Sequence, residues 1–541
     1  MRVPTTVPVA PQGGLVARSR GRTLAVIALS AVMAGASLVA PVAAQSPAPV
    51  AAQSPAPVTG GILRFARNQE PSTLNPIGCF DNGCIWALTQ IFDQLVDVTA
   101  DGLAPGLAES WTSSADGLVW TFHLRDAKFS NGDPVTADDV KFSLDRFADP
   151  KVNASYAGVA ASIGSVDVVD PKTVTITLKH PDGAILENLA MFVPSIIDKS
   201  VYEAVGDEAY GTAPVGSGPF MVKSFNRGQS LELVRNPYYW KPGQPYLDGV
   251  TFSFVPDDNT RILQLQNNEA DVAAEIPYSQ VAQLDAADGI RVQVEDVLTW
   301  DALWLNNKRK PFDEPAVRQA LAYATPREDM LASVLFGNAE VANSLIAKGK
   351  YWSADVPAYT YDIAKAKELL ATSSVPNGFP MELIIVAGDT VERQEAEIIK
   401  EAWSQIGVDL TIRPVDITSI FDEWFGGNVD AATFPGNTLS SDTLSDDNLA
   451  QVFYDPAGGA NSFGTGYSNP EVAAILTAAN QSLDETVRAA DFARMQTVTM
   501  ADAESVPLFF TKARTGLSDK VQGFRTVQPG WWDLENVWLQ P

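Results

Sequence analysis

Strand-like and helix-like patterns follow one another along almost the whole chain after residue 60, and this mixture restricts the possible fold more than any other feature. Apolar residues alternate over 118–125, which is typical of a half-buried strand, whereas those in 84–96 recur at helical spacing. Roughly 480 residues are too many for one hydrophobic core. The sequence therefore predicts an α/β protein of two or three domains.

Turn and capping residues sharpen this prediction locally. The turn Asp170-Pro171-Lys172 lies between two short apolar runs and predicts a hairpin over 166–178. Asn226-Arg227-Gly228 predicts a second hairpin over 220–234 in the same way. Thr136, followed by two acidic residues, is expected to cap a helix. The segments 60–67, 315–324, 363–370 and 392–406 are predicted to be a first strand and three helices, in that order.

The first 44 residues have the pattern of a secretory signal peptide. Residues 1–22 contain four arginines and no acidic residue, 24–40 are apolar, and 42–44 are small. An uncleaved membrane anchor is the alternative interpretation. A lipid-anchored amino terminus is not expected, because no cysteine precedes Cys79. Residues 45–59 form an Ala/Pro-rich segment, part of a repeated octapeptide, that we expect to be flexible. The mature protein is thus predicted to be exported, to the periplasm or another extracytoplasmic space.

Charge argues against several classes of partner. The formal net charge is -27 and becomes -31 once the four arginines of 1–44 are removed. Such an acidic chain is not expected to bind nucleic acid or an anionic membrane surface. The simplest consequence of the charge is solubility.

No catalytic motif is present in the sequence. The two histidines, His123 and His180, do not stand in a triad or metal-ligand arrangement, and no phosphate loop or nucleophile elbow occurs. Carboxylates are numerous, so composition alone does not exclude a glycosidase that uses two of them in catalysis. We predict a protein that is not an enzyme and that uses no cofactor.

The two cysteines, Cys79 and Cys84, are expected to form a disulfide in an exported protein. The spacing is not that of a zinc site. The alternative is a pair of free, buried thiols. A disulfide across so short a loop adds little chain-entropy stabilisation, roughly 2 kcal/mol at most, so its expected effect is to fix the shape of the loop.

A series of short motifs resembles family 5 of the bacterial extracellular solute-binding proteins, which includes binders of dipeptides, oligopeptides and nickel chelates. The motifs occur in the family's order: Pro105–Trp111, Asp116–Arg125, Phe129–Val140, Gly216–Phe220, Arg235–Trp240, Lys310–Asp313, Val317–Ala324, Tyr361–Leu370, Ile406–Leu410 and Val521–Phe524. The resemblance implies a periplasmic-binding-protein-like fold in which two lobes close over a ligand, one lobe being enlarged by an extra domain. It also implies a substrate-binding component, expected to be a monomer, that delivers a solute to the permease of an ATP-binding-cassette (ABC) importer.

The resemblance also implies a domain division. We expect three domains: domain I at 60–96, 212–305 and 511–541, domain II at 97–211, and domain III at 306–510. The two segments that cross between the lobes are expected near 303–307 and near 508–512.

Two charged residues are candidates for binding a peptide's termini. Dipeptide-binding relatives use an Asp in a domain III loop for the ammonium and an Arg in domain III for the carboxylate. The resemblance brings Asp442 and Arg393 to these positions. A solvated helix face, with Arg393 paired to Glu397, and a turn carboxylate at Asp442 are the alternatives.

Further candidates for contact with the ligand are aromatic or lie in the cysteine loop. Trp300 and Trp304 share one face of a predicted strand just before the expected crossover. Core packing is the alternative for both. The remaining candidates are Glu70, Phe80 and Phe434.

Two departures from the family pattern leave a helix boundary, in the first case, and the ligand, in the second, open. Thr325-Pro326 replaces an apolar residue and an Asp, and the loop 435–448 lacks the family's usual acidic run. A peptide is the expected ligand, and an oligosaccharide or another small polar solute is the alternative within the same transport role. A secreted glycan-binding or glycan-cleaving protein is the alternative from a different class. Direct metal ligation is not expected from two poorly placed histidines.

Overall fold

The computed structural model describes residues 56–541 except 80–81, 100–101, 154–157, 357, 435–449, 451–453, 455–461 and 528–529. The predicted signal peptide at 1–44 lies outside the described residues, and so do residues 45–55 of the Ala/Pro-rich segment. None of the helices in the described ranges is both long and apolar enough to cross a bilayer.

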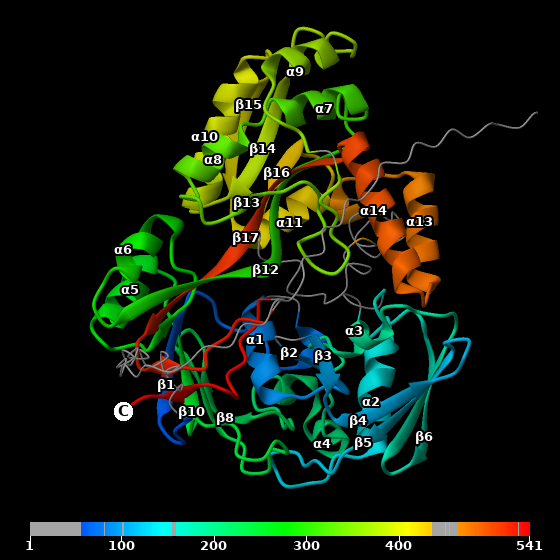
Figure 1. Ribbon diagram of the computed structural model, residues 1–541, viewed down its shortest axis with the longest axis vertical. Helices are drawn as coiled ribbons and strands as arrows, with labels where there is room; N and C mark the ends of the chain where they lie inside the picture. The colour runs from blue at the N-terminus through cyan, green and yellow to red at the C-terminus, as the bar shows by residue number, and fades with distance from the viewer. Residues whose placement is uncertain are drawn as a thin grey trace, which may run out of the picture. The chain divides into compact units, whose positions relative to one another are not determined.

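A long mixed sheet joins strands from distant parts of the sequence (Figure 1). Its strands run in the order β15 (Asp409–Val415), β14 (Pro380–Val386), β16 (Ala431–Thr433), β12 (Ile290–Leu305), β17 (Ser505–Ser518), β11 (Val272–Ala273), β1 (Ile62–Arg67), β10 (Gly249–Phe254), β9 (Ser230–Arg235) and β8 (Phe220–Asn226), with β13 (Glu340–Val341) paired to β17. β1 pairs in parallel with both β10 and β11, so these three strands end at the same edge.

Three smaller sheets complete the strand structure. They are β4 (Ala108–Ser113), β5 (Val119–Leu124), β7 (Thr173–Leu178) and β6 (Ile163–Asp170) in that order, β2 (Val96–Thr99) with β3 (Gly102–Pro105), and β18 (Val521–Gln522) with β19 (Trp538–Leu539). Both predicted hairpins are confirmed, because β6 pairs antiparallel with β7 and β8 with β9.

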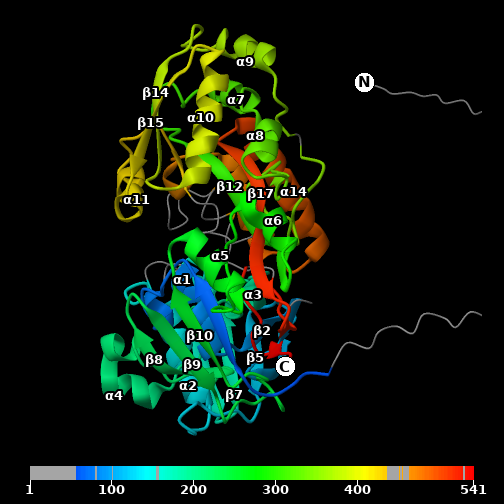
Figure 2. The ribbon, with the colours of Figure 1, turned by 90° about the vertical axis from the view of Figure 1, so that its left-hand side faces the viewer.

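The helices flank these sheets, and Figure 2 shows α10 beside β14 and β15. Their bounds are α1 (Asn82–Ile91), α2 (Ala137–Ala148), α3 (Ile185–Leu189), α4 (Lys199–Tyr210), α5 (Asp258–Gln266), α6 (Val281–Asp285), α7 (Pro315–Tyr323), α8 (Arg327–Ser333), α9 (Ile363–Leu370), α10 (Thr390–Ser404), α11 (Ile417–Phe425), α13 (Pro470–Gln481) and α14 (Glu485–Asp502), with 3₁₀ turns η1 (Pro76–Gly78), η2 (Tyr278–Gln280) and η3 (Ser462–Gly464). The predicted cap is present: Thr136 precedes α2, and its backbone N–H donates to Asp139 Oδ2 at 2.9 Å.

The buried apolar residues divide the unit 57–541 into two bodies, which we call the first and second lobes. One core cluster joins residues from 63–274 and 517–537, and it includes the inner faces of both the β1–β10 region and the four-stranded sheet. Two further clusters are built from residues of 298–510, apart from Tyr278. We therefore define the first lobe as 57–297 and 511–541 and the second lobe as 298–510. β12 and β17 run through both.

The core cluster changes along β12 before the segment where the crossover is expected. Leu298 already packs in a second-lobe cluster, whereas Ile290 packs with first-lobe residues. The pairing of β12 with β17 also breaks register between Asp296 and Trp300. A break in register bends a strand and increases its local twist. Core-cluster membership thus changes at about 296–300 in β12 and between Phe510 and Leu517 in β17. The crossovers expected near 303–307 and 508–512 stay predictions.

Candidate functional site

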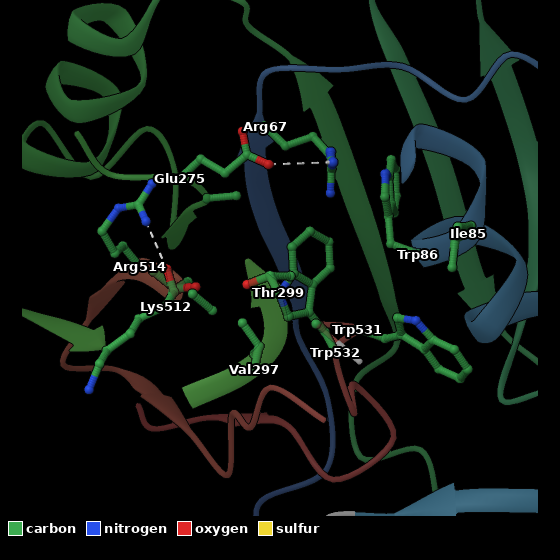
Figure 3. A pocket seen from close by; sticks show the side chains of 14 residues that line it. Arg67, Ile85, Trp86, Glu275, Val297, Thr299, Lys512, Arg514, Trp531 and Trp532 are labelled. Atoms are coloured by element: carbon green, nitrogen blue, oxygen red, sulfur yellow. Dashed lines mark hydrogen bonds and ion pairs between the residues drawn. The ribbon is translucent and has the colours of Figure 1, made fainter. Parts of the chain in front are cut away.

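A cavity of about 90 Å³ lies where β1 and β11 end, next to the segments of β12 and β17 that cross between the lobes (Figure 3). Ligand sites in open α/β sheets tend to form at such carboxyl ends of parallel strands. The walls combine charged residues with indole rings from α1 and from the chain's last segment. The lining residues are Arg67, Ile85, Trp86, Ala274, Glu275, Val297, Thr299, Lys512, Ala513, Arg514, Thr515, Gly530, Trp531 and Trp532.

The Arg67 guanidinium forms the centre of one wall. It lies 4.6 Å from the ring centroid of Trp86 and 5.1 Å from that of Trp532, so both indoles make cation–π contacts with it. Its Nη2 lies 3.9 Å from Glu275 Oε1, and this ion pair is one of the dashed lines in Figure 3. Arg67 is only 3% exposed. The stacked, planar guanidinium is thereby fixed in orientation, which an ammonium group could not reproduce.

Two more cations come from β17. Lys512 Nζ lies 2.9 Å from Asp296 Oδ1, and the hydrogen bond to Asp296 raises the pKa of Lys512. Arg514 donates from Nη1 to the Lys512 carbonyl at 2.7 Å, and its guanidinium lies 3.6 Å from the centre of the Tyr278 ring. The cavity therefore presents fixed positive charge together with the carboxylate of Glu275.

The disulfide fixes the start of the helix that provides Trp86. Cys79 and Cys84 are bonded, with their Cα atoms 5.9 Å apart, as the sequence predicted. Cys84, Ile85 and Trp86 lie in the first turns of α1, and all three are buried. The disulfide-closed loop thus leads directly into the turn of α1 that contributes Ile85 and Trp86 to the cavity.

A cluster of buried acidic side chains lies where β12 approaches the amino end of α10. Burial raises the pKa of Glu392 to about 8, and burial together with the neighbouring carboxylates raises the pKa of Glu395. Burial also raises the pKa of Asp301, although the positive charge of Arg514 opposes this shift. Burial thus favours the protonated forms of these acids, because their charged forms are poorly solvated.

A second cavity, of about 70 Å³, lies between the end of α1, β2 and the last segment of the chain. Its charged groups pair with one another. Lys241 Nζ lies 3.0 Å from Asp97 Oδ2 and 2.7 Å from Glu535 Oε1, and Asp93 accepts a hydrogen bond from Trp240 Nε1 at 3.0 Å. Burial raises the pKa of Asp93 to about 7. These contacts hold the carboxyl-terminal segment against the first lobe.

The predicted tryptophans lie outside the lining of the first cavity. Trp300 and Trp304 do share one face of β12, with ring centroids 5.6 Å apart in an edge-to-face arrangement. They are 5% and 2% exposed and belong to a second-lobe core cluster with Phe434 and Phe463. Their burial favours core packing, which was the alternative interpretation. Phe434, also predicted as a ligand contact, is buried and stacks on Phe421 with centroids 4.8 Å apart.

The other predicted site residues are scattered. Glu70 forms an ion pair with Arg227 at 3.7 Å and accepts a hydrogen bond from the Gly228 backbone N–H, so it holds the β8–β9 hairpin. Arg393 is exposed in the first turn of α10. Phe80 and Asp442 lie outside the described residues. Within the described ranges, no group of three His, Cys, Asp or Glu side chains is placed to hold a metal ion.

Sequence reasoning missed the residues that line the cavity most closely. Arg67 is the last residue of the first strand, and Trp86 follows the cysteine loop by two positions. Trp531 and Trp532 come from the far end of the chain. Strand-end position could have pointed to Arg67, but no local signal connects it with a tryptophan pair more than four hundred residues away.

Comparison with known proteins places this architecture in one family. Residues 102–461 match the model of the bacterial extracellular solute-binding proteins, family 5 (middle region). The glutathione-binding protein GsiB of Escherichia coli O1:K1 / APEC is 30% identical over 439 residues, which cover 80% of this chain and 86% of that protein. GsiB of Salmonella typhimurium is 30% identical over 423 residues, covering 77% and 82%.

Solved structures agree with this assignment. The periplasmic binding protein DppA of Helicobacter pylori, in complex with the peptide STSA, has a TM-score of 0.81 at 27% identity, covering 90% of this chain and 99% of that one. AgaA of A. tumefaciens R10, in complex with agropinic acid, has a TM-score of 0.80 at 27% identity, covering 89% and 99%. The chain belongs to family 5 of the bacterial extracellular solute-binding proteins.

Proposed function

We propose that this protein is the extracytoplasmic substrate-binding component of an ABC importer and that its ligand is a peptide-like solute. The solute binds between the lobes, the lobes close, and the closed form delivers the solute to a membrane permease. Such closure is a population shift, because a ligand favours the closed form only through contacts that the open form lacks. Family membership supports the transport role, and relatives described as glutathione-binding or bound to the peptide STSA support the ligand class.

The cavity at the ends of β1 and β11, beside the crossing segments of β12 and β17, is the observation that carries the peptide assignment. A peptide brings an ammonium, a carboxylate and amide groups into a space that excludes water, and each charge needs a partner there. Arg67, Lys512 and Arg514 supply positive charge, and Glu275 supplies negative charge. Trp86, Trp531 and Trp532 supply apolar surface for side chains at low cost in conformational entropy.

The predicted terminus-binding residues remain part of this proposal. Arg393 is exposed, so its guanidinium is accessible to a ligand carboxylate, and bidentate pairing suits that group. Asp442 is proposed to bind the peptide ammonium. Asp442→Asn should then weaken peptide binding by roughly 1.5–3 kcal/mol, the range for a hydrogen bond to a charged group. An unchanged affinity would remove the terminus-binding role of Asp442.

The domain division is proposed in a revised form. The first lobe would contain domains I and II, and the second lobe would be domain III, with its boundary moved from 305/306 to about 297/298. The change of core cluster and the break in β12 pairing support the revision. We propose that the protein acts as a monomer.

Calorimetry with a small panel tests the ligand class. Glutathione and Ser-Thr-Ser-Ala are expected to bind, and maltotriose is expected not to, because a neutral sugar leaves the cavity's charges unpartnered. Arg67→Lys should weaken peptide binding, because it removes the planar guanidinium between two indoles. Arg64→Lys on the same strand is the control, since Arg64 forms its ion pair with Asp271 at 2.6 Å, outside the cavity. Tighter binding of maltotriose than of either peptide would favour the oligosaccharide alternative.

A further inference from the structure

The two lobes meet a second time, away from β12 and β17. The Gly183 backbone N–H, in the turn before α3 of the first lobe, donates to the carbonyl of Asn480 in α13 of the second lobe at 2.9 Å. Figure 1 shows the lower ends of α13 and α14 approaching the part of the first lobe that contains α3. A backbone hydrogen bond of normal length therefore connects the lobes at this point.

The absence of a side chain at residue 183 allows this approach. A Cβ atom there would lie 2.0 Å from Arg488 Nη1 and 2.5 Å from the Ser482 carbonyl oxygen. Both neighbours belong to the second lobe, and Arg488 is only 1% exposed. The Gly183 backbone is not in the left-handed region, so the strain on an alanine comes from these close second-lobe atoms and not from its backbone conformation.

An ion pair lies beside this close approach. Lys350 Nζ, from the second lobe, is 3.3 Å from Glu187 Oε1 of the first lobe and 2.9 Å from Glu485 Oε1 of its own lobe. Tyr351 OH donates to Glu485 Oε2 at 2.7 Å, which helps to fix the carboxylate. We call the contact formed by 183 and 187 with 350, 480, 482, 485 and 488 the Gly183 seam.

We propose that the Gly183 seam stabilises the closed arrangement of the lobes and so determines affinity from outside the ligand cavity. None of its residues lines that cavity, and all of its bonds join protein groups. The seam therefore stabilises the closed form by the same free energy whichever solute is bound. Because the solute binds the closed form, the apparent affinity for the solute changes with the fraction of protein that is closed. The affinity effect rests on the proposed function, because it assumes that closure captures the solute.

Crosslinking tests the seam without any ligand. Cysteines are introduced as Glu187→Cys and Lys350→Cys, and the rate of reaction with a short bismaleimide reports how often the lobes meet. The native cysteines are bonded to each other and should not react. Adding Gly183→Ala is expected to slow crosslinking at least tenfold. Gly158→Ala is the matched control in the same lobe, because a Cβ at residue 158 meets nothing within 4 Å and its backbone is not left-handed.

Three results would overturn the proposal: no crosslink in the reference protein, equal rates with and without Gly183→Ala, or equal slowing by Gly158→Ala. Thermal unfolding of each variant checks that the lobes themselves are intact. Because the nearest atoms to a Cβ at residue 183 belong to the second lobe, Gly183→Ala should unfold at the same temperature as Gly158→Ala to within a few degrees.

Calorimetry with Ser-Thr-Ser-Ala measures the consequence for affinity. Gly183→Ala should raise its Kd at least tenfold, equivalent to about 1.4 kcal/mol, and Gly158→Ala should leave it unchanged. If wild type binds no peptide but crosslinking behaves as expected, the peptide assignment fails and the seam stands. If Gly183→Ala binds the peptide as tightly as wild type, the seam has no effect on affinity and this inference fails, while the transport role stands.

Discussion

Replacing Trp300 with alanine distinguishes a core residue from a ligand contact. The Trp300 side chain is 5% exposed and packs edge-to-face on Trp304 in the second-lobe core. Removing a buried aromatic side chain destabilises a protein by about 3–5 kcal/mol, because the cavity left behind closes only partly. The lost aromatic pairing contributes about 0.5–1.5 kcal/mol of this.

The expected result is therefore a large loss of stability in the absence of any ligand. For a lobe of about 200 residues, such a change lowers the melting temperature by on the order of 10 °C. Differential scanning calorimetry of ligand-free wild type and Trp300→Ala measures it, and Trp300→Phe is the control that keeps an aromatic ring. The affinity for Ser-Thr-Ser-Ala should change less than in Arg67→Lys, since Trp300 does not line the cavity.

The opposite outcome would refute the core assignment. If Trp300→Ala melts within about 2 °C of wild type but loses peptide affinity, its indole contacts the ligand, as the sequence first suggested. The aromatic cluster around Trp304 and Phe463 would then be a ligand surface instead of a core.

Three other substitutions test separate parts of the structure. Burial raises the pKa of Glu504 to about 8, so the contribution of Glu504 to the free energy of unfolding falls as pH rises from about 4 to about 8. Glu504→Gln should remove this contribution, so its stability relative to wild type should rise by roughly 4 kcal/mol between pH 5 and pH 9 in urea unfolding. A stability difference that stays constant with pH would contradict the buried, protonated state. Replacing both Cys79 and Cys84 with serine should lower the free energy of unfolding by about 2 kcal/mol or less, because the closed loop is short. A larger loss in urea unfolding would show that the disulfide does more than constrain the unfolded chain. Lys350→Ala should weaken peptide affinity less than Gly183→Ala does, because half-exposed ion pairs contribute only about 0–1 kcal/mol to the free energy of a contact. If calorimetry shows the reverse order, most of the free energy of the Gly183 seam comes from the ion pair.

Much of the fold could be predicted because its signals are local. The turn at Asp170–Lys172 and the cap at Thr136 each specify their own neighbourhood, and both occur where expected. The family motifs then implied the two-lobe arrangement, which the hydrophobic patterns alone could not predict. The register break near Asp296 has no such signal in the sequence, so it could not be predicted.

The candidate site was harder to predict, because tertiary packing assembles it. Arg67 meets Trp532 only after β1, α1 and the carboxyl-terminal segment have packed together. The pattern at Trp300 and Trp304 gave the correct face of the strand but could not tell a core face from a ligand face, since both are apolar. Glu70 was proposed from its place in a loop, and only the structure reveals its ion pair with Arg227.

Mass spectrometry of the solute that copurifies with the exported protein tests the central claim most directly. The protein is isolated without added ligand, its bound small molecules are released by denaturation, and their masses and fragments are determined for wild type and for Arg67→Lys. The account predicts a short peptide or a peptide-like amino-acid conjugate with wild type, and less of it with Arg67→Lys. A neutral oligosaccharide that is retained equally by both proteins would contradict it.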